Sequence, residues 1–291
     1  MSFFDRTDQR TEAAHRKALL SAGRLEVIPL KNLAAQLEHI PPGSSLSVTA
    51  SPVKTLEDTL DLTEQLAALG HDPVPHLAAR MVESKEHLAR LLDRMGTLGC
   101  KELFLVGGDA PEPFGDFDDA VQVLEAITAL DHDLDHIGVT AYPDGHAFIS
   151  DEAMHDALFA KQEILQAAGI EGHASTQMCF DAQAISRWLR AERAAGFELP
   201  VHLGIPGAVE RTKLLTMGAR LGVGASLRFL KKNTNALFKM FAPGGYDPNK
   251  LLSPLAGELE ELGIEALHIF TFNQIETTVA WRDASIAALK A

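Results

Sequence analysis

The sequence predicts an α/β protein built as a single (β/α)8 barrel with an extra helix at its N-terminus. Three observations lead to this prediction: short apolar runs that read as strands, longer stretches of helical period between them, and a length of 291 residues. Such a barrel typically needs about 250 residues. A leading helix over 1–22 and an enlarged helical connection over 208–262 would account for the surplus. Since no linker divides the chain, residues 1–291 are expected to form one domain.

The predicted strands follow the leading helix in order along the chain. Each is an apolar run bounded by glycine, proline or polar residues. An open doubly wound sheet would also alternate strands and helices, but its dinucleotide-binding form needs Gly-x-Gly-x-x-Gly after the first strand, and "LEVIPLKN" has none. The barrel is therefore preferred, with strands at 24–30, 45–50, 73–79, 101–108, 136–142, 173–180, 200–207 and 266–272.

The predicted helices between the strands carry recognisable ends. In "TLEDTLDLTEQLAALG" (55–70), leucines recur at helical spacing and Gly70 supplies a stop. The stretches "SKEHLARLLDRMGTLG" (84–99) and "DAQAISRWLRAERAAG" (181–196) share the design. A polar residue able to cap each helix and a terminal glycine are expected in all three.

Composition excludes several classes of function. The formal net charge is −14 with no lysine or arginine cluster, which argues against nucleic acid or an anionic membrane as a partner. Cys100 and Cys179 each lie in an apolar stretch and are expected to be reduced core thiols. The N-terminal residues lack the apolar segment of a signal peptide, and no apolar run reaches bilayer-spanning length. We expect an acidic, cytoplasmic enzyme, with a homo-oligomer left open.

Polar residues occupy the carboxyl ends of the predicted strands, where a barrel places its catalytic groups. Glu26 stands between Leu25 and Val27, which is a costly place for a carboxylate without a function. The others have structural alternatives: a core histidine, interior hydrogen bonds or a braced turn. The set therefore indicates a site more strongly than any member does: Glu26, Thr49, His76, Asp109, Tyr142, His146, Gln177 and Asn273.

The stretch "LFLVGGDAP" (103–111) ends a predicted strand with two glycines and an aspartate. Gly107 and Gly108 either form a simple turn, which these residues alone favour, or let a ligand approach the main chain with Asp109 facing it.

Two further segments invite a ligand. The run "DHDLDH" (131–136) crowds acids and histidines together, but it precedes the fifth strand on the barrel face away from the chemistry, so no metal site is predicted. The segment "RLGVGASLRFLKKN" (220–233) is either a capped surface helix or a site for cofactor phosphates. Trp188 and Trp281 are expected to pack between helices, whereas Phe180 is a candidate for the substrate pocket.

Motifs spread over most of the chain resemble those of the methylenetetrahydrofolate reductase family. Their order and spacing match the family across six strands or more, whereas any one alone would be weak. The motifs are "LEVIP" with Glu26, "SVTAS" with Thr49, "PHLAAR" with His76, "GGD" at 107–109, "VTAYPDGH" at 139–146, "STQMCFD" at 175–181 and "HIFTFN" at 268–273.

The resemblance implies a (β/α)8 barrel that holds FAD at the carboxyl ends of its strands. It also implies reduction of 5,10-methylenetetrahydrofolate to 5-methyltetrahydrofolate, or the reverse, with NADH or NADPH. By this resemblance Glu26 is the general acid, Asp109 lies beside flavin and pterin, and Gln177 contacts folate, with Phe180 and Asn273 as further substrate candidates. The flavin-contacting candidates are Thr49, His76, Gly107, Gly108, Tyr142, His146, Asp156 and Lys161.

The implied reaction needs two carboxyl groups in different states. The substrate's five-membered ring opens to an iminium cation when the departing nitrogen is protonated, and desolvation that raises the pKa of Glu26 would supply that proton. An ionised Asp109 would stabilise the cation without transferring a proton.

This chain departs from the family where FAD phosphates would bind. Gly107 stands where the family commonly has arginine, and Glu163 and Phe159 interrupt a commonly basic or polar run near Lys161. Each charge-assisted hydrogen bond is worth about 1.5–3 kcal/mol, so their loss weakens FAD binding. FAD could be held through Arg80, Lys161 or a helix N-terminus, bind weakly, or be absent from a reductase that transfers hydride directly from NAD(P)H. A non-redox folate-binding protein or one-carbon transferase is the alternative from another class.

Overall fold

Eight parallel strands close into a barrel in the computed structural model, which describes residues 3–210, 212–214, 216, 241–242 and 245–289. The strands are β1 (Arg24–Val27), β2 (Ser45–Val48), β3 (Asp72–Ala78), β4 (Glu102–Val106), β5 (His136–Ala141), β6 (Glu171–Thr176), β7 (Val201–Pro206) and β10 (Ile264–Phe270). Their order is β1-β10-β7-β6-β5-β4-β3-β2, and every neighbouring pair is parallel. The predicted barrel is confirmed, because each predicted strand overlaps an observed one.

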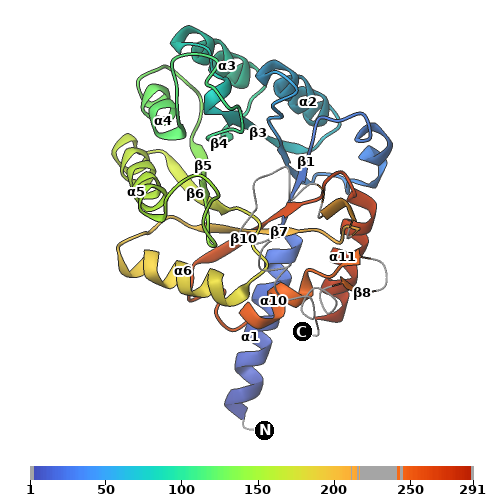
Figure 1. Ribbon diagram of the computed structural model, residues 1–291. Helices are drawn as coiled ribbons and strands as arrows, with labels where there is room; N and C mark the ends of the chain where they lie inside the picture. Colours follow the sequence, from blue (N-terminus) through green and yellow to red (C-terminus); the bar gives the residue numbers. More distant parts are fainter. Residues whose placement is uncertain (1–2, 211, 215, 217–240, 243–244, 290–291) are drawn as a thin grey trace.

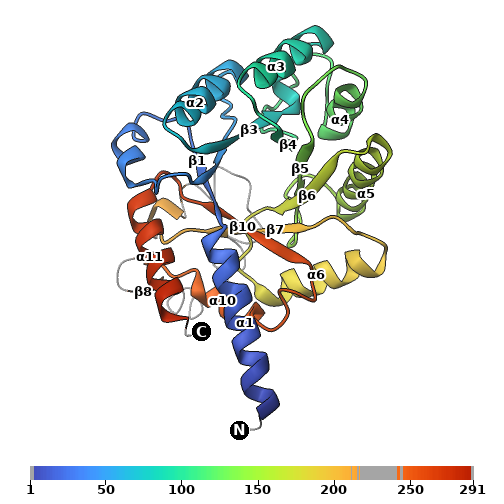
Figure 2. The same ribbon diagram turned by 180° about the vertical axis from the view of Figure 1, so that it is seen from behind.

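Helices surround the strands in chain order (Figure 1). The leading helix α1 projects beyond this ring, with the N-terminus at its far end (Figure 2). The helices are α1 (Phe3–Ser21), α2 (Leu56–Ala68), α3 (Lys85–Thr97), α4 (Ala120–Thr128), α5 (Asp151–Ala168), α6 (Ala182–Ala194), α10 (Asn249–Leu255) and α11 (Ile275–Ala288), with short 3-10 turns η1 (Ala34–His39) and η2 (Ala79–Met81). Between β7 and β10, the described residues form the antiparallel pair β8 (Phe241–Ala242) and β9 (Gly245–Tyr246) and helix α10.

The predicted helix ends are confirmed by their hydrogen bonds. The Thr55 hydroxyl accepts from the Asp58 backbone N–H at 3.1 Å, and the Asp58 carboxylate accepts from the Thr55 N–H at 2.9 Å, which is a capping box. Ser84 and Asp181 cap α3 and α6 in the same sense. The glycines that follow these three helices all have positive φ, namely Gly70, Gly99 and Gly196.

Imidazole rings line much of the barrel interior. Aliphatic side chains usually fill this space. Here Phe104 contacts the rings of His76, His173 and His268, and the ring of His173 stacks on His202 with centroids 3.5 Å apart. A Cβ at Gly138 would lie 2.6 Å from Cε1 of His173, so this glycine gives the ring its space.

An ion pair lies at the amino-terminal end of the barrel, below these rings. Both guanidinium Nη atoms of Arg24 donate to the carboxylate of Glu102, at 2.5 and 2.7 Å, joining β1 to β4. Cys100 and Cys179 form no disulfide bond. Among the helices that the structure describes, none has the length and apolar character needed to cross a membrane.

Candidate active site

A cavity of about 120 Å³ opens among the carboxyl ends of the strands. Six residues predicted from the sequence line it: Glu26, Thr49, His76, Asp109, Tyr142 and Gln177. The barrel thus brings together residues that are spread along the chain from position 26 to position 177. Several other lining residues were not predicted from the sequence, among them Phe104, Thr140, Ser175, Thr176, His268 and Phe270.

Glu26 lies at the floor of this cavity with 6% of its surface exposed. Nε2 of His268 lies 2.8 Å from its Oε2, and Nε2 of His76 lies 3.9 Å from the same oxygen. The hydroxyl of Thr271 donates to the Glu26 backbone carbonyl at 2.5 Å. Both the carboxylate and the backbone of Glu26 are therefore held by neighbouring residues.

The pKa of Glu26 shifts in the direction opposite to the one expected from the sequence. Burial is the largest single influence and raises it, but hydrogen bonds from His268 and Thr49 and the electrostatic interactions with the His268 and His76 rings together lower it by more, so the resulting pKa lies below the ordinary value. The expectation that desolvation would leave Glu26 with a raised pKa was wrong for this structure. That expectation took account of burial but not of the His268 imidazole, which lies on β10 against the carboxylate.

His76 is a neutral neighbour of Glu26. Its Nε2 lies 2.6 Å from the hydroxyl of Ser47, and burial lowers its pKa to about 4. Near neutral pH this ring is uncharged, so it can take part in hydrogen bonds without adding a positive charge to the site.

Asp109 lies at the rim, exposed, directly after the two glycines. The surrounding protein removes part of its hydration and raises its pKa, while His146 acts in the opposite sense. Gly108 has φ of 91°, and this backbone conformation accounts for a glycine there. Gly107 has no such requirement, since a Cβ there would meet nothing within 4 Å. Neither packing nor a positive φ explains the glycine at position 107.

Other predicted site residues lie outside the cavity lining. Phe180 is buried against Tyr246, with ring centroids 5.5 Å apart. The Asn273 amide accepts from the Ile28 N–H and donates to the Ile28 carbonyl, both at 2.9 Å, and so joins the loops after β10 and β1. Gly107, Gly108, His146, Asp156 and Lys161 also do not line it. The segment 220–233 lies outside the described residues.

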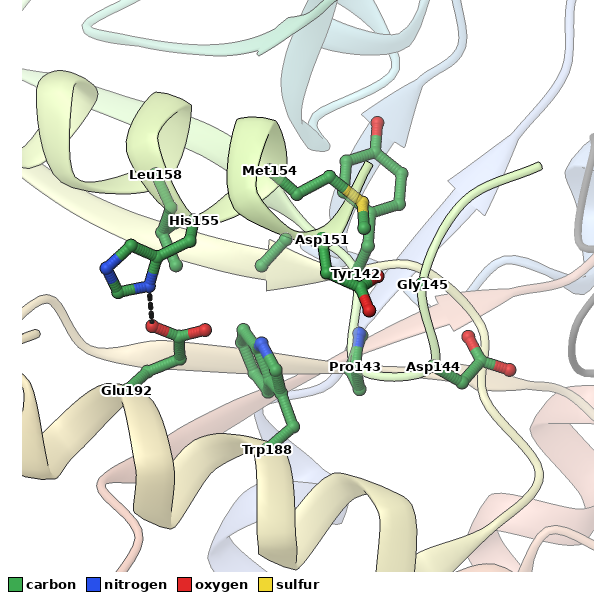
Figure 3. A pocket seen from close by; sticks show the side chains of 11 residues that line it. Tyr142, Pro143, Asp144, Gly145, Asp151, Met154, His155, Leu158, Trp188 and Glu192 are labelled. Atoms are coloured by element: carbon green, nitrogen blue, oxygen red, sulfur yellow. Dashed lines mark hydrogen bonds and ion pairs between the residues drawn. The ribbon is translucent and has the colours of Figure 1, made fainter. Parts of the chain in front are cut away.

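A second cavity, of about 270 Å³, lies between α5 and α6. Figure 3 shows Trp188 and Glu192 of α6 facing Met154 and His155 of α5 across it. His155 Nδ1 and the Glu192 carboxylate are 2.7 Å apart. Tyr142 lines both cavities and so forms the wall between them. Trp188 packs against the core as predicted and also lines this second cavity.

A sequence model of a protein family, described as methylenetetrahydrofolate reductase, matches residues 29–226. The chain belongs to the methylenetetrahydrofolate reductase family. Among solved structures, an uncharacterized protein from Clostridium thermocellum that binds two copies of 5-methyl-5,6,7,8-tetrahydrofolic acid is similar with a TM-score of 0.61 and 17% identity. The match covers 92% of this chain and 94% of that one. A 2,3-dimethylmalate lyase matches with a TM-score of 0.46 and 13% identity, over 96% of this chain and 87% of that one.

The FAD of this reductase family requires cationic partners for its pyrophosphate, and the two cations suggested by the sequence do not fit that role. The Arg80 guanidinium donates to three backbone carbonyls, those of Ala110, Pro111 and Asp118, at 2.8–3.0 Å. Lys161 is 4% exposed, and its amino group donates to the Thr140 carbonyl at 3.2 Å. Burial also lowers the pKa of Lys161 to about 8. In this structure both cationic groups are therefore already held by backbone carbonyls.

Proposed function

We propose that this chain reduces 5,10-methylenetetrahydrofolate to 5-methyltetrahydrofolate with NADH or NADPH as the hydride donor, or catalyses the reverse. The observation that carries the proposal is a pair of carboxylates, Glu26 and Asp109, that line one cavity together with the amide of Gln177. Family membership supports the substrate class. The folate ligand of the C. thermocellum protein of similar fold is consistent with it.

The reaction divides into a proton transfer and a hydride transfer. Protonation of the departing nitrogen opens the five-membered ring and leaves an iminium cation. The hydride then adds to the iminium carbon, giving the methyl group and oxidised nicotinamide. One proton and one hydride are consumed for each methyl group formed, and the reverse reaction returns both.

The proton passes through Glu26, which His268 holds at 2.8 Å. A ring bound over the cavity would remove the remaining water from this pair and disfavour charge on the carboxylate, so that Glu26 carries the proton when the ring opens. Asp109, on the rim, stabilises the iminium cation when ionised. Gln177 supplies an amide that can donate to and accept from the pterin edge.

We further propose that hydride passes directly from nicotinamide to folate. The commitment of Arg80 and Lys161 to backbone carbonyls and the absence of a side chain at Gly107 favour this route, because a pyrophosphate at this edge would lack its cations. Transfer by way of FAD stays as the second candidate, since it is the typical chemistry of the family.

The test follows the absorbance of NADH or NADPH mixed with the purified protein and 5,10-methylenetetrahydrofolate. One sample contains no flavin, and a second has been saturated with FAD and freed of the unbound excess. Oxidation in the first sample supports direct transfer. Oxidation only in the second refutes direct transfer but keeps the reductase. Folate binding without oxidation in either sample refutes the reductase in favour of a non-redox folate protein.

Glu26→Gln is the matched variant for this test. It removes the transferable proton at nearly constant size, so folate reduction is expected to fall by about 10²–10⁴-fold while folate binding is retained. Folate turnover at the unmodified rate would refute the role of Glu26.

A further inference from the structure

Three residues with metal-binding side chains meet at the amino-terminal end of the barrel, on the face opposite the candidate active site. Glu102 is the first residue of β4, His136 the first of β5, and His173 lies in β6. One potential ligand atom from each lies within 4.8 Å of the other two. The sequence run 131–136 supplies only one of them, so its spacing alone did not reveal the cluster.

The distances within this cluster are close to those of a tetrahedral metal site. His136 Nε2 and His173 Nδ1 are 2.7 Å apart, and His173 Nδ1 is 3.8 Å from Oε1 of Glu102. Bonds of about 2.0–2.1 Å to one ion would separate ligand atoms by roughly 3.3 Å. An ion would fit if the distance between the two imidazole nitrogens increased by about 0.5 Å and the distance from His173 Nδ1 to Glu102 Oε1 decreased by about 0.5 Å.

The surroundings supply the outer contacts that such ligands need. The other ring nitrogen of His136, Nδ1, lies 3.9 Å from the carboxylate of Glu171, so a shift of about 1 Å would bring it to the hydrogen-bond distance at which a carboxylate orients a metal-binding histidine. Arg24 holds the carboxylate of Glu102 in place.

A cavity of about 690 Å³ gives access to the cluster and has a negative lining. Asp72, Glu102, Asp135 and Glu171 line it, against a single lysine, Lys101. This excess of carboxylates offsets the positive charge of Arg24 and favours a divalent cation over an anion. The cavity also leaves room for a water molecule as a further ligand.

We propose that Glu102, His136 and His173 bind a divalent transition metal ion of the Zn²⁺ class. Two imidazoles and one carboxylate suit such an ion better than Mg²⁺ or Ca²⁺, which prefer oxygen ligands alone. The ion would join the starts of three neighbouring strands, β4, β5 and β6. It would stabilise the barrel from the face remote from the chemistry and would leave the mouth cavity unchanged.

The experiment titrates Zn²⁺ into the full-length, chelator-treated protein by calorimetry, with Co²⁺ as a spectroscopic substitute. One ion per chain is expected, with a visible Co²⁺ spectrum of low coordination number. Glu171→Gln should weaken binding about tenfold, and His136→Gln should weaken it more. The control is His155→Gln, which removes a histidine from another histidine–carboxylate pair and should bind as the unmodified chain does.

Three outcomes would overturn the proposal: no stoichiometric binding, unchanged affinity in His136→Gln, or an equal loss in His155→Gln. If His136→Gln fails to fold, X-ray absorption of the Zn²⁺-loaded unmodified protein decides. Two imidazoles at about 2.0–2.1 Å support the site, and a spectrum without imidazole refutes it. Because every readout is metal binding, failure here is distinguishable from failure of the proposed reductase activity.

Discussion

His268 Nε2 lies 2.8 Å from Glu26 Oε2, across the pairing of the first and last strands of the barrel. The two residues are 242 positions apart in the chain. Closure of the barrel therefore creates the contact, and His268 acts together with His76 and Thr49 to lower the pKa of Glu26 by more than burial raises it. His268 does not need to touch substrate to affect the reaction, so we regard it as a positioning residue.

His268→Gln is expected to shift the pH dependence of folate reduction. The imidazole lowers the pKa of Glu26, so in the variant burial should be opposed only by the weaker effects of His76 and Thr49, and that pKa should rise. If the reaction needs protonated Glu26, activity should persist to higher pH than in the unmodified protein. The measurement is kcat/KM against pH. An unchanged alkaline limb would show that His268 only fills space.

Asp109→Asn is expected to lower kcat/KM at neutral pH by about 10²-fold, because loss of one electrostatic partner of a developing charge typically costs this much. Thermal stability should change little, since the side chain is exposed. Steady-state kinetics with saturating NAD(P)H would measure the loss. Asp116→Asn, an exposed carboxylate in the same loop, is the control, and an equal loss there would indicate a general charge effect.

Two glycine variants should separate a packing role from a ligand-binding role. A Cβ at Gly204 would lie 1.9 Å from the backbone oxygen of Thr176, so Gly204→Ala should destabilise the fold by about 3 kcal/mol or more. Gly107→Ala meets nothing within 4 Å and should leave thermal unfolding unchanged while raising the KM for NAD(P)H or folate. A Gly107→Ala protein with unaltered kinetics would show that no ligand approaches there.

Acidification should destabilise the barrel through its neutral histidines. Burial lowers the pKa of His76 to about 4 and that of His202 to about 3, below the value of 6.5 for a free side chain. The unfolded chain then binds protons that the folded one does not, so stability present above pH 6.5 is lost as the pH falls toward 3. The loss is on the order of a few kcal/mol for each ring.

Thermal unfolding measured at several pH values tests this expectation. His202→Asn should flatten the dependence, whereas His39→Asn, outside the barrel interior, should not. Equal slopes in all three proteins would mean that other groups govern the acid transition.

The strands, their order and the helix ends could be predicted because each depends on local signals. Apolar runs mark the strands, and Thr55, Ser84 and Asp181 mark helix starts. Glu26, Asp109 and Gln177 could be proposed because polar residues at strand ends are rare without a use. Their separate roles came from the resemblance to the reductase family. The contacts in the structure do not test those roles.

His268 and Ser175 were missed because they lie within apolar runs, where only a period of two separates the inward face from the outward one. In "ALHIFTF", His268 and Phe270 share the inward face, and this alternation could have indicated them. The direction of the Glu26 pKa could not be predicted, because it depends on a partner from the last strand. Asn273 was proposed as a substrate contact because its hydrogen bonds to the Ile28 backbone depend on the folded structure and cannot be recognised in the sequence.

The three carbonyls bound by Arg80 belong to the loop that follows Asp109. A loop already fixed in the free protein loses little conformational entropy when a ligand binds, so little affinity is sacrificed to ordering it. Association at this edge of the barrel should then resemble docking to a rigid surface, with a rate that depends on diffusion and charge more than on loop closure.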